Sequence, residues 1–136
     1  MYLVDTNVLC EPTRARPADS VGRWLLSQSS VKVSALSLME LEYGLARLAP
    51  GDKRDRLTKW LEGVLASSAI EIVPVDAAVA RSAGRLKRLA ESGGRPRPLA
   101  DLLIAACAQV TGSVVATRNT ADFEGLGVPL LNPFVG

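Results

Sequence analysis

The chain has 136 residues, 48% of them hydrophobic, which is enough for one substantial core and too little for two ordinary domains. Sixteen basic residues against fourteen acidic ones leave a formal charge of +2, so any affinity for nucleic acid must come from local patches. The sequence has no histidine, which excludes Ser-His-Asp catalysis and histidine-bound zinc. We expect one domain over residues 1–136.

The cysteines and the apolar runs bear on cellular location. Cys10 and Cys107 lack the spacing of a metal-binding or redox pair, and two cysteines are too few for a disulfide-stapled secreted scaffold. No signal sequence precedes the first apolar stretch, and the longest apolar run, 102–108, is far shorter than a membrane span. These features predict a cytoplasmic protein that does not enter a membrane.

Short apolar stretches rich in β-branched residues alternate along the chain with longer segments of helical periodicity. The predicted strands are 2–4, 31–33, 70–75, 113–117 and 129–131. The predicted helices are 19–27, 38–48, 52–67, 76–91 and 98–110, with a short helical turn at 6–10. This alternation predicts an α/β domain with a mainly parallel central sheet.

The first predicted strand runs directly into Asp5, an ionised side chain that a hydrophobic core would exclude. In sheets of this kind, ligands bind at the carboxyl ends of the strands, because loops and helix N-termini meet there. We therefore expect Asp5 to face a ligand crevice. The alternative is that Asp5 only caps the helical turn at 6–10, a role that aspartate fills well.

Three further carboxylates, Glu40, Asp101 and Asp122, lie just after a predicted strand or just inside a predicted helix. Each also has a purely structural explanation. Residues 37–40 match a helix capping box, in which Glu40 would bond to the backbone at the start of the helix. Asp101 lies about one turn inside an apolar helix, where the helix dipole favours it. Asp122 could cap a short helix at 123–126.

Grouping these four acids changes their interpretation. Two carboxylates about 5 Å apart repel by roughly 3 kcal/mol at an effective dielectric constant of 20, so a cluster needs protons or a cation. Oxygen ligands without histidine favour Mg²⁺ or Mn²⁺ over zinc. Such an ion can activate water and neutralise charge on a phosphoryl group, which is the chemistry of metal-dependent nucleases.

The blocks that carry these acids are characteristic of a known family. They are DTN at residues 5–7, SLMELEYG around Glu40, D-x-x-I-A-A-x-A at 101–108 and T-R-N-x-x-D-F at 117–123. Over essentially its whole length the chain resembles the PIN-domain ribonucleases, and among them the VapC-type toxins of bacterial toxin–antitoxin pairs. The resemblance implies a PIN-like three-layer α/β/α sandwich.

The resemblance also implies roles for particular residues. The catalytic and metal-binding acids would be Asp5, Glu40, Asp101 and Asp122. The family's acid precedes the glycine by four residues, which selects Glu40 rather than Glu42. Polar residues at matching positions would orient the acids or a water molecule: Asn7, Ser37, Thr117 and Asn119.

The implied reaction is hydrolysis of phosphodiester bonds in structured RNA, such as transfer or ribosomal RNA, with Mg²⁺ or Mn²⁺ as cofactor. The implied partners are a small cognate antitoxin protein that covers the active site, promoter DNA reached through that antitoxin, and a second copy of the chain in a homodimer. An alternative keeps the fold but makes the chain a partner in a DNA-associated regulatory complex with weak or no nuclease activity.

Basic and apolar surfaces offer further candidates for binding. Arginines near the predicted acid pocket could contact RNA phosphates: Arg95, Arg97 and Arg118. The arginines at 81, 85 and 88 follow one helix face, which more often is an ordinary solvated face. The apolar faces of helices 38–48 and 52–67, with Tyr43, Trp60 and Leu61, are either core or a groove for an antitoxin helix.

A phosphoryl-acceptor domain is a weaker alternative. Such phosphatases also place an aspartate at the end of the first strand, but they carry a second one two residues later. Asn7 occupies that position here.

Overall fold

The computed structural model describes residues 1–135 as an α/β fold in which all four strand pairings are parallel. The strands lie in the order β3-β2-β1-β4-β5. Their bounds are β1 (Tyr2–Val4), β2 (Val31–Ser34), β3 (Ile70–Val73), β4 (Val114–Ala116) and β5 (Leu130–Leu131). The helices of the described residues are α1 (Thr6–Leu9), α2 (Asp19–Ser27), α3 (Ala35–Ala46), α4 (Asp52–Ala66), α5 (Ala77–Ser92) and α6 (Leu99–Thr111), with 3₁₀ turns η1 (Glu11–Thr13) and η2 (Thr120–Asp122).

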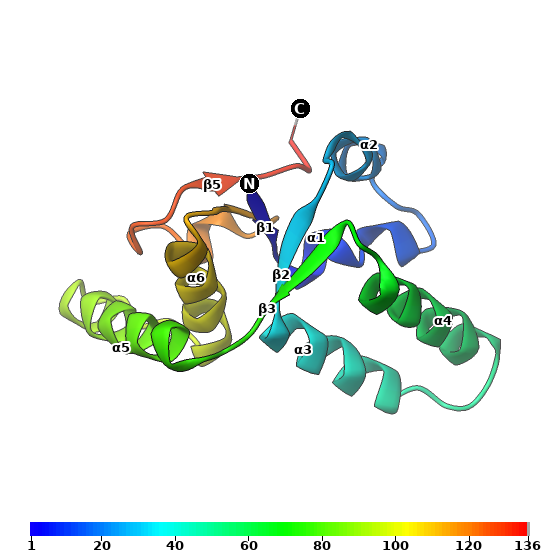
Figure 1. Cartoon of the computed structure of the whole chain (residues 1–136), viewed down its shortest axis with the longest axis horizontal. Helices are drawn as coiled ribbons and strands as arrows, with labels where there is room; N and C mark the ends of the chain where they lie inside the picture. Colours follow the sequence, from blue (N-terminus) through cyan, green and yellow to red (C-terminus); the bar gives the residue numbers. More distant parts are fainter. Residues whose placement is uncertain (136) are drawn as a thin grey trace.

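Helices cover both faces of the sheet, with α5 and α6 on one side and α1, α2 and α4 on the other (Figure 1). Neighbouring residues of β1 serve opposite faces, because side chains alternate along a strand. Leu3 packs into the core beneath α5 and α6, whereas Val4 packs into the core on the side of α1, α2 and α4. Both side chains are fully buried. The predicted α/β/α architecture is confirmed, and the sheet is wholly rather than mainly parallel.

The strand order reverses direction between β1 and β4. The chain builds outward from β1 to β2 and β3, and then crosses back through α5 and α6 to place β4 on the other side of β1. Crevices at such switch points are where open α/β sheets bind ligands. Asp5 leaves the end of β1 and Thr117 leaves the end of β4, so both lie at this crevice.

Two local expectations were wrong. α3 begins at Ala35, not at residue 38, because Ser34 at the end of β2 is its N-cap and accepts a hydrogen bond from the Leu36 amide at 3.1 Å. The capping box at 37–40 therefore does not exist, since Ser37 already lies inside the helix.

The second error concerns the segment after β4. Asp122 does not cap a helix at 123–126 but ends the turn η2, whose amides bond back to Asn119 and Thr120. Gly125 and Gly127 have φ angles of 81° and 73°, a left-handed backbone that prevents helix formation there.

Within residues 1–135, no helix combines the length and the apolar character that crossing a membrane requires.

Candidate active site

A cavity of about 340 Å³ opens at the carboxyl end of β1, between α1, α3 and the start of α6. Three of the four predicted acids line it: Asp5, Glu40 and Asp101. Its other lining residues are Thr6, Asn7, Cys10, Arg14, Ala100, Ile104 and Asn119. Segments that are far apart in the sequence therefore direct carboxylates into one space.

Asp5 is held rigidly at this cavity although its residue is only 8% exposed. Its Oδ1 accepts the Thr6 amide at 2.8 Å, so it does cap α1, as the alternative interpretation proposed. Its Oδ2 accepts the Thr117 hydroxyl at 2.8 Å and the Asn7 side-chain amide at 3.1 Å. Burial raises the pKa of Asp5, whereas these hydrogen bonds lower it. Capping and facing the cavity are thus compatible roles of one side chain.

The predicted supporting residues Asn7, Thr117 and Asn119 form a chain of hydrogen bonds around Asp5. The Asn119 amide donates to the Thr117 hydroxyl at 3.1 Å, and that hydroxyl donates to Asp5. The side-chain oxygen of Asn7 accepts the Arg118 amide at 3.2 Å while its nitrogen donates to Asp5. The loop after β4 is therefore tied to the start of α1, with Asp5 at the junction.

Glu40 reaches the cavity from the second turn of α3 and is positioned by Thr6. The Thr6 hydroxyl oxygen lies 2.9 Å from Glu40 Oε1 and 2.9 Å from the Ser37 hydroxyl oxygen. Because the Thr6 hydroxyl has only one proton, it donates to the Glu40 carboxylate and accepts a hydrogen bond from the Ser37 hydroxyl. Ser37, predicted as a supporting residue, thus acts through Thr6. Glu42 is exposed and lines a different surface hollow.

Asp101, in the first turn of α6, is the most perturbed of the four acids. Burial, followed by the charges of Asp122, Asp5 and Glu40, raises its pKa from 3.8 to about 6. Among residues 1–135 its carboxylate accepts no side-chain hydrogen bond, and the charge of Arg97 is what lowers its pKa. All three of the other predicted acids therefore repel the charged form of Asp101.

Asp122 does not line the cavity but acts on it electrostatically, raising the pKa of both Asp101 and Asp5. Its segment is clasped by arginines. Arg97 Nε donates to the Asp122 carbonyl at 2.9 Å, and its other nitrogens donate to the carbonyls of Arg95 and Glu124.

The loop arginines are engaged in ways that the sequence did not suggest. Arg95 donates to the Ala121 carbonyl at 2.7 Å, so Arg95 and Arg97 both hold backbone carbonyls of the segment around Asp122. The guanidinium of Arg118 lies 4.8 Å from the centre of the Phe134 ring, a cation–π stack. All three arginines that were predicted to contact RNA phosphates thus have intramolecular partners.

The donor set fits a hard divalent cation in its chemistry. The carboxylates that face the cavity offer only oxygen, and the repulsion at Asp101 would be relieved by a positive charge. In the described part of the chain, however, no three Asp, Glu or Cys side chains are close enough, as they stand, to hold an ion between them. Mg²⁺ usually binds to only one or two carboxylates and completes its coordination shell with water. Widely spaced carboxylates therefore suit a partly hydrated Mg²⁺ better than an ion enclosed entirely by protein ligands.

Sequence reasoning missed three residues of this site. Thr6 links Ser37 and Glu40, and Arg14 lines the cavity beside the buried Glu11. Glu11 and Arg14 are three residues apart in a short helical turn, a spacing that favours ion pairs and could have revealed them.

A second hollow of about 260 Å³ lies between α3 and α4 and shares Cys10 and Glu40 with the acidic cavity. Most of its lining is apolar: Leu41, Leu45, Leu48, Leu57, Trp60 and Leu61. The predicted anchors Trp60 and Leu61 therefore face this groove, whereas Tyr43 is 62% exposed and stacks with Arg47.

Comparison with known proteins decides the family. The PIN domain model matches residues 2–127. VapC ribonuclease Y4jK of Sinorhizobium fredii is 36% identical over 137 aligned positions, which cover 98% of each chain. Toxin FitB of Neisseria gonorrhoeae is 37% identical, covering 98% of this chain and 99% of its own. The chain belongs to the VapC family of PIN-domain ribonuclease toxins. The family predicted from the sequence is confirmed.

A further relative and two solved structures match this PIN domain over nearly its whole length. The tRNA(fMet)-specific endonuclease VapC of Shigella flexneri is 31% identical, covering 93% of this chain and 92% of its own. The crystal structure of FitAcB from Neisseria gonorrhoeae matches with a TM-score of 0.89 and 35% identity over the whole of both chains. VapBC2 from Rickettsia felis, bound to a DNA fragment from their promoter, matches with a TM-score of 0.82 and 26% identity, covering 96% and 97% of the two chains.

Proposed function

We propose that this PIN domain hydrolyses phosphodiester bonds in structured RNA, with Mg²⁺ or Mn²⁺ bound among Asp5, Glu40, Asp101 and Asp122, directly at one or two of these carboxylates and through water at the others. The observation that carries the proposal is the convergence of four acid-bearing segments on one crevice, where burial and then the charges of the other three acids raise the pKa of Asp101 to about 6. Acids that repel one another in this way favour binding of a divalent cation.

Each side chain has a defined part in that proposal. Asp5 is immobilised by Thr6, Asn7 and Thr117, so it offers a carboxylate at a fixed position with little entropic cost. Asp101, which no other side chain holds, would adjust to the ion and, below its pKa of about 6, would release its proton as the ion binds. When bound, the ion would supply charge neutralisation at the phosphoryl group and a lowered pKa for water.

For the RNA itself we propose a structured molecule such as transfer RNA. Support comes from the Shigella flexneri relative, whose name describes a tRNA(fMet)-specific endonuclease. The open shape of the cavity also suits a single-stranded loop, whose bases are unstacked and whose backbone can enter the crevice.

The partners follow from the surfaces next to the cavity. We propose that a small antitoxin lays an amphipathic helix in the groove between α3 and α4 and continues over the acids, because the groove and the acidic cavity share Cys10 and Glu40. Promoter DNA would be reached through that antitoxin, as in the VapBC2 structure bound to promoter DNA. The site of action would be the cytoplasm.

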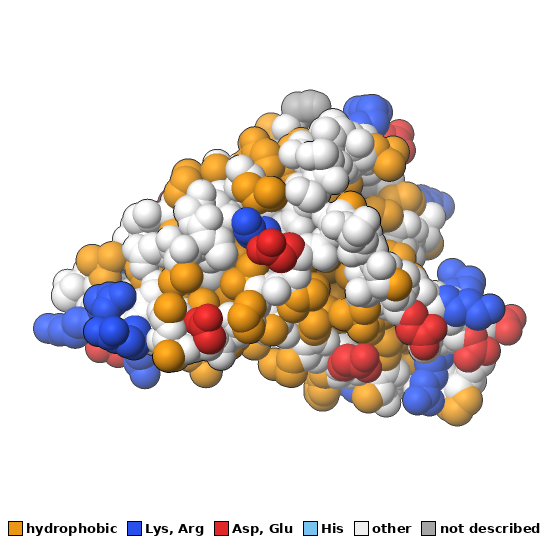
Figure 2. Space-filling view, in the orientation of Figure 1, with side chains coloured by type: hydrophobic (Ala, Val, Ile, Leu, Met, Phe, Trp, Pro, Cys, Tyr) orange, Lys and Arg blue, Asp and Glu red, His pale blue; other side chains and the backbone are white. Residues whose placement is uncertain are grey.

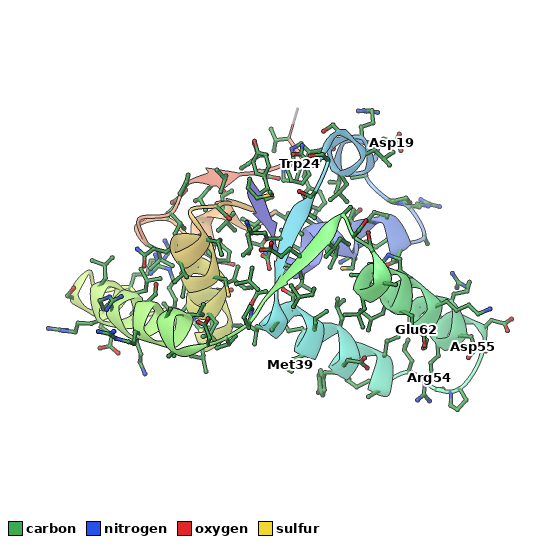
Figure 3. All side chains as sticks on the ribbon, in the orientation of Figure 1. Asp19, Trp24, Met39, Arg54, Asp55 and Glu62 are labelled. Atoms are coloured by element: carbon green, nitrogen blue, oxygen red, sulfur yellow. The ribbon has the colours of Figure 1, made fainter. Side chains whose placement is uncertain are left out.

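A homodimer would use the outward face of α3. Met39 and Tyr43 are 56% and 62% exposed and, four residues apart, lie on one side of that helix. Figure 2 shows hydrophobic side chains along the lower edge of the molecule, where Figure 3 places Met39. Such an exposed apolar face is typical of an association surface.

The test is RNA cleavage by purified, antitoxin-free protein in Mg²⁺ or Mn²⁺. We expect cleavage by the wild type, none in chelator, and none by Asp5→Asn or Asp101→Asn. Glu42→Gln, an exposed acid two residues from Glu40, should cleave like the wild type. A wild type that binds DNA with an antitoxin but cleaves no RNA under any metal would instead favour the regulatory alternative.

A further inference from the structure

One basic side chain lines the acidic cavity. Of the described residues that line it, Arg14 is the only basic one. It follows η1, the short turn after α1, and its side chain is 58% exposed. A cavity rich in carboxylates repels the polyanionic backbone of RNA, so a basic group at its edge bears directly on how a substrate approaches.

Arg14 is held in place by an unusual partner. Its Nε lies 3.1 Å from Oε1 of Glu11, which is only 5% exposed, and Glu11 Oε2 accepts the Ala18 amide at 2.9 Å. The buried carboxylate therefore fixes the inner edge of the guanidinium. Within residues 1–135 the two terminal nitrogens of Arg14 have no hydrogen-bond or ion-pair partner, so the outer edge of the guanidinium remains available.

We propose that Arg14 binds a backbone phosphate of the RNA substrate, next to the bond that the acidic site cleaves. This inference rests on the proposed function. A guanidinium donates two parallel hydrogen bonds to phosphate oxygens, and one that is already oriented loses little side-chain entropy on binding. Glu11 thus acts as a positioning residue for Arg14.

The other basic groups are poorer candidates for this contact. Arg95 and Arg97 hold backbone carbonyls, and Arg118 is stacked on Phe134. α4 carries charges of both signs, among them the labelled Arg54, Asp55 and Glu62 in Figure 3. Among these groups, Arg14 alone combines an available guanidinium edge with a place at the acids.

The test measures binding of a non-cleavable RNA oligonucleotide over a series of salt concentrations. Arg14→Gln should weaken binding about tenfold and reduce the slope of log K against log salt by about 0.7, the value for one phosphate contact on a single strand. Arg14→Lys, which keeps the charge and loses the paired geometry, should fall between. Arg16→Gln is the matched control, since it removes an exposed charge from the same loop and should change neither quantity.

A double variant distinguishes phosphate binding by Arg14 from a purely structural role, in which Arg14 only neutralises the buried Glu11. Arg14→Gln with Glu11→Gln removes the unpaired buried charge and should restore the thermal stability that Arg14→Gln loses, while RNA binding stays weak. Restored RNA binding in the double variant would overturn the proposal. Equal binding by Arg14→Gln and Arg16→Gln would overturn it too, as would a wild type that binds no RNA.

Cleavage by the same proteins separates this inference from the proposed function. In a wild type that cleaves RNA, Arg14→Gln should raise KM about tenfold with a much smaller change in kcat, because the contact is made in the bound substrate as well as in the transition state. A wild type that binds RNA through Arg14 but does not cleave it would refute the proposed function and leave the contact standing.

Discussion

Replacing Asp101 by asparagine should stabilise the metal-free protein while it destroys the site. The rise in the pKa of Asp101 from 3.8 to about 6 corresponds to about 3 kcal/mol of unfavourable interaction of its charged form. Because the side chain is only partly buried, solvent screening reduces the part that appears as stability to about 1–2 kcal/mol. For a domain of this size that is a rise in melting temperature of about 3–8 °C.

The extra stability of Asp101→Asn over the wild type should grow as the pH rises. Between pH 3.8 and about 6 the folded wild type keeps a proton on Asp101 that the unfolded chain has released, so its stability falls as pH rises through this window. Asparagine does not titrate. The variant should therefore be more stable than the wild type above pH 6, and the difference should vanish as the pH approaches 4.

Added metal should reverse the order of thermal stability between Asp101→Asn and the wild type. In chelator, thermal unfolding at neutral pH should show the variant above the wild type. Saturating Mn²⁺ stabilises a protein that binds it by about 2.7 kcal/mol at a hundred times the dissociation constant, and only the wild type should gain this. Glu42→Gln is the control, with no change in either condition. A variant that is less stable than the wild type in chelator at neutral pH would refute the repulsion on which the site is argued.

Other substitutions test the surroundings of the acids. Thr117→Val removes the buried hydroxyl that donates to Asp5 at 2.8 Å and should cost about 1–2 kcal/mol in urea unfolding, with slower cleavage; unchanged values would show that this bond contributes nothing. Arg97→Gln releases the carbonyls around Asp122 and should speed amide hydrogen exchange in residues 122–126 without exposing the core, whereas equal exchange would refute the clasp. Met39→Glu should convert the proposed dimer to a monomer in light scattering, and a wild type that is already monomeric would contradict the α3 interface.

Local patterns in the sequence were enough to predict the architecture. Strand 2–4 is apolar and continuous, and the polar DTN that follows it marks the point where the backbone leaves the sheet. The helix beginning near Pro98 and ending at Gly112 was predicted within one residue, because proline favours a helix start and Gly112 adopts a left-handed φ of 63°. These signals lie in the residues that form the element itself.

Long-range side-chain contacts could not be predicted in the same way. The bond from Thr6 to Glu40 joins residues 34 positions apart, and the bond from Arg97 to Asp122 spans 25. Arg97 was therefore predicted to contact RNA, since nothing in its neighbourhood announces the carbonyls that it holds. The start of α3 was misplaced for a related reason: leucine periodicity marks the buried face, while the actual boundary was set by Ser34 at the end of a strand.

Direct titration of Mn²⁺ into metal-free protein, followed by electron paramagnetic resonance of free and bound ion, tests the central claim that the converging acids form a divalent-cation site. The wild type should bind Mn²⁺ at neutral pH and bind it more weakly below pH 6, where Asp101 holds a proton. The variant that combines Asp5→Asn with Asp101→Asn should lose the bound signal while remaining folded. Equal binding by the wild type and this variant would contradict the assignment of the site.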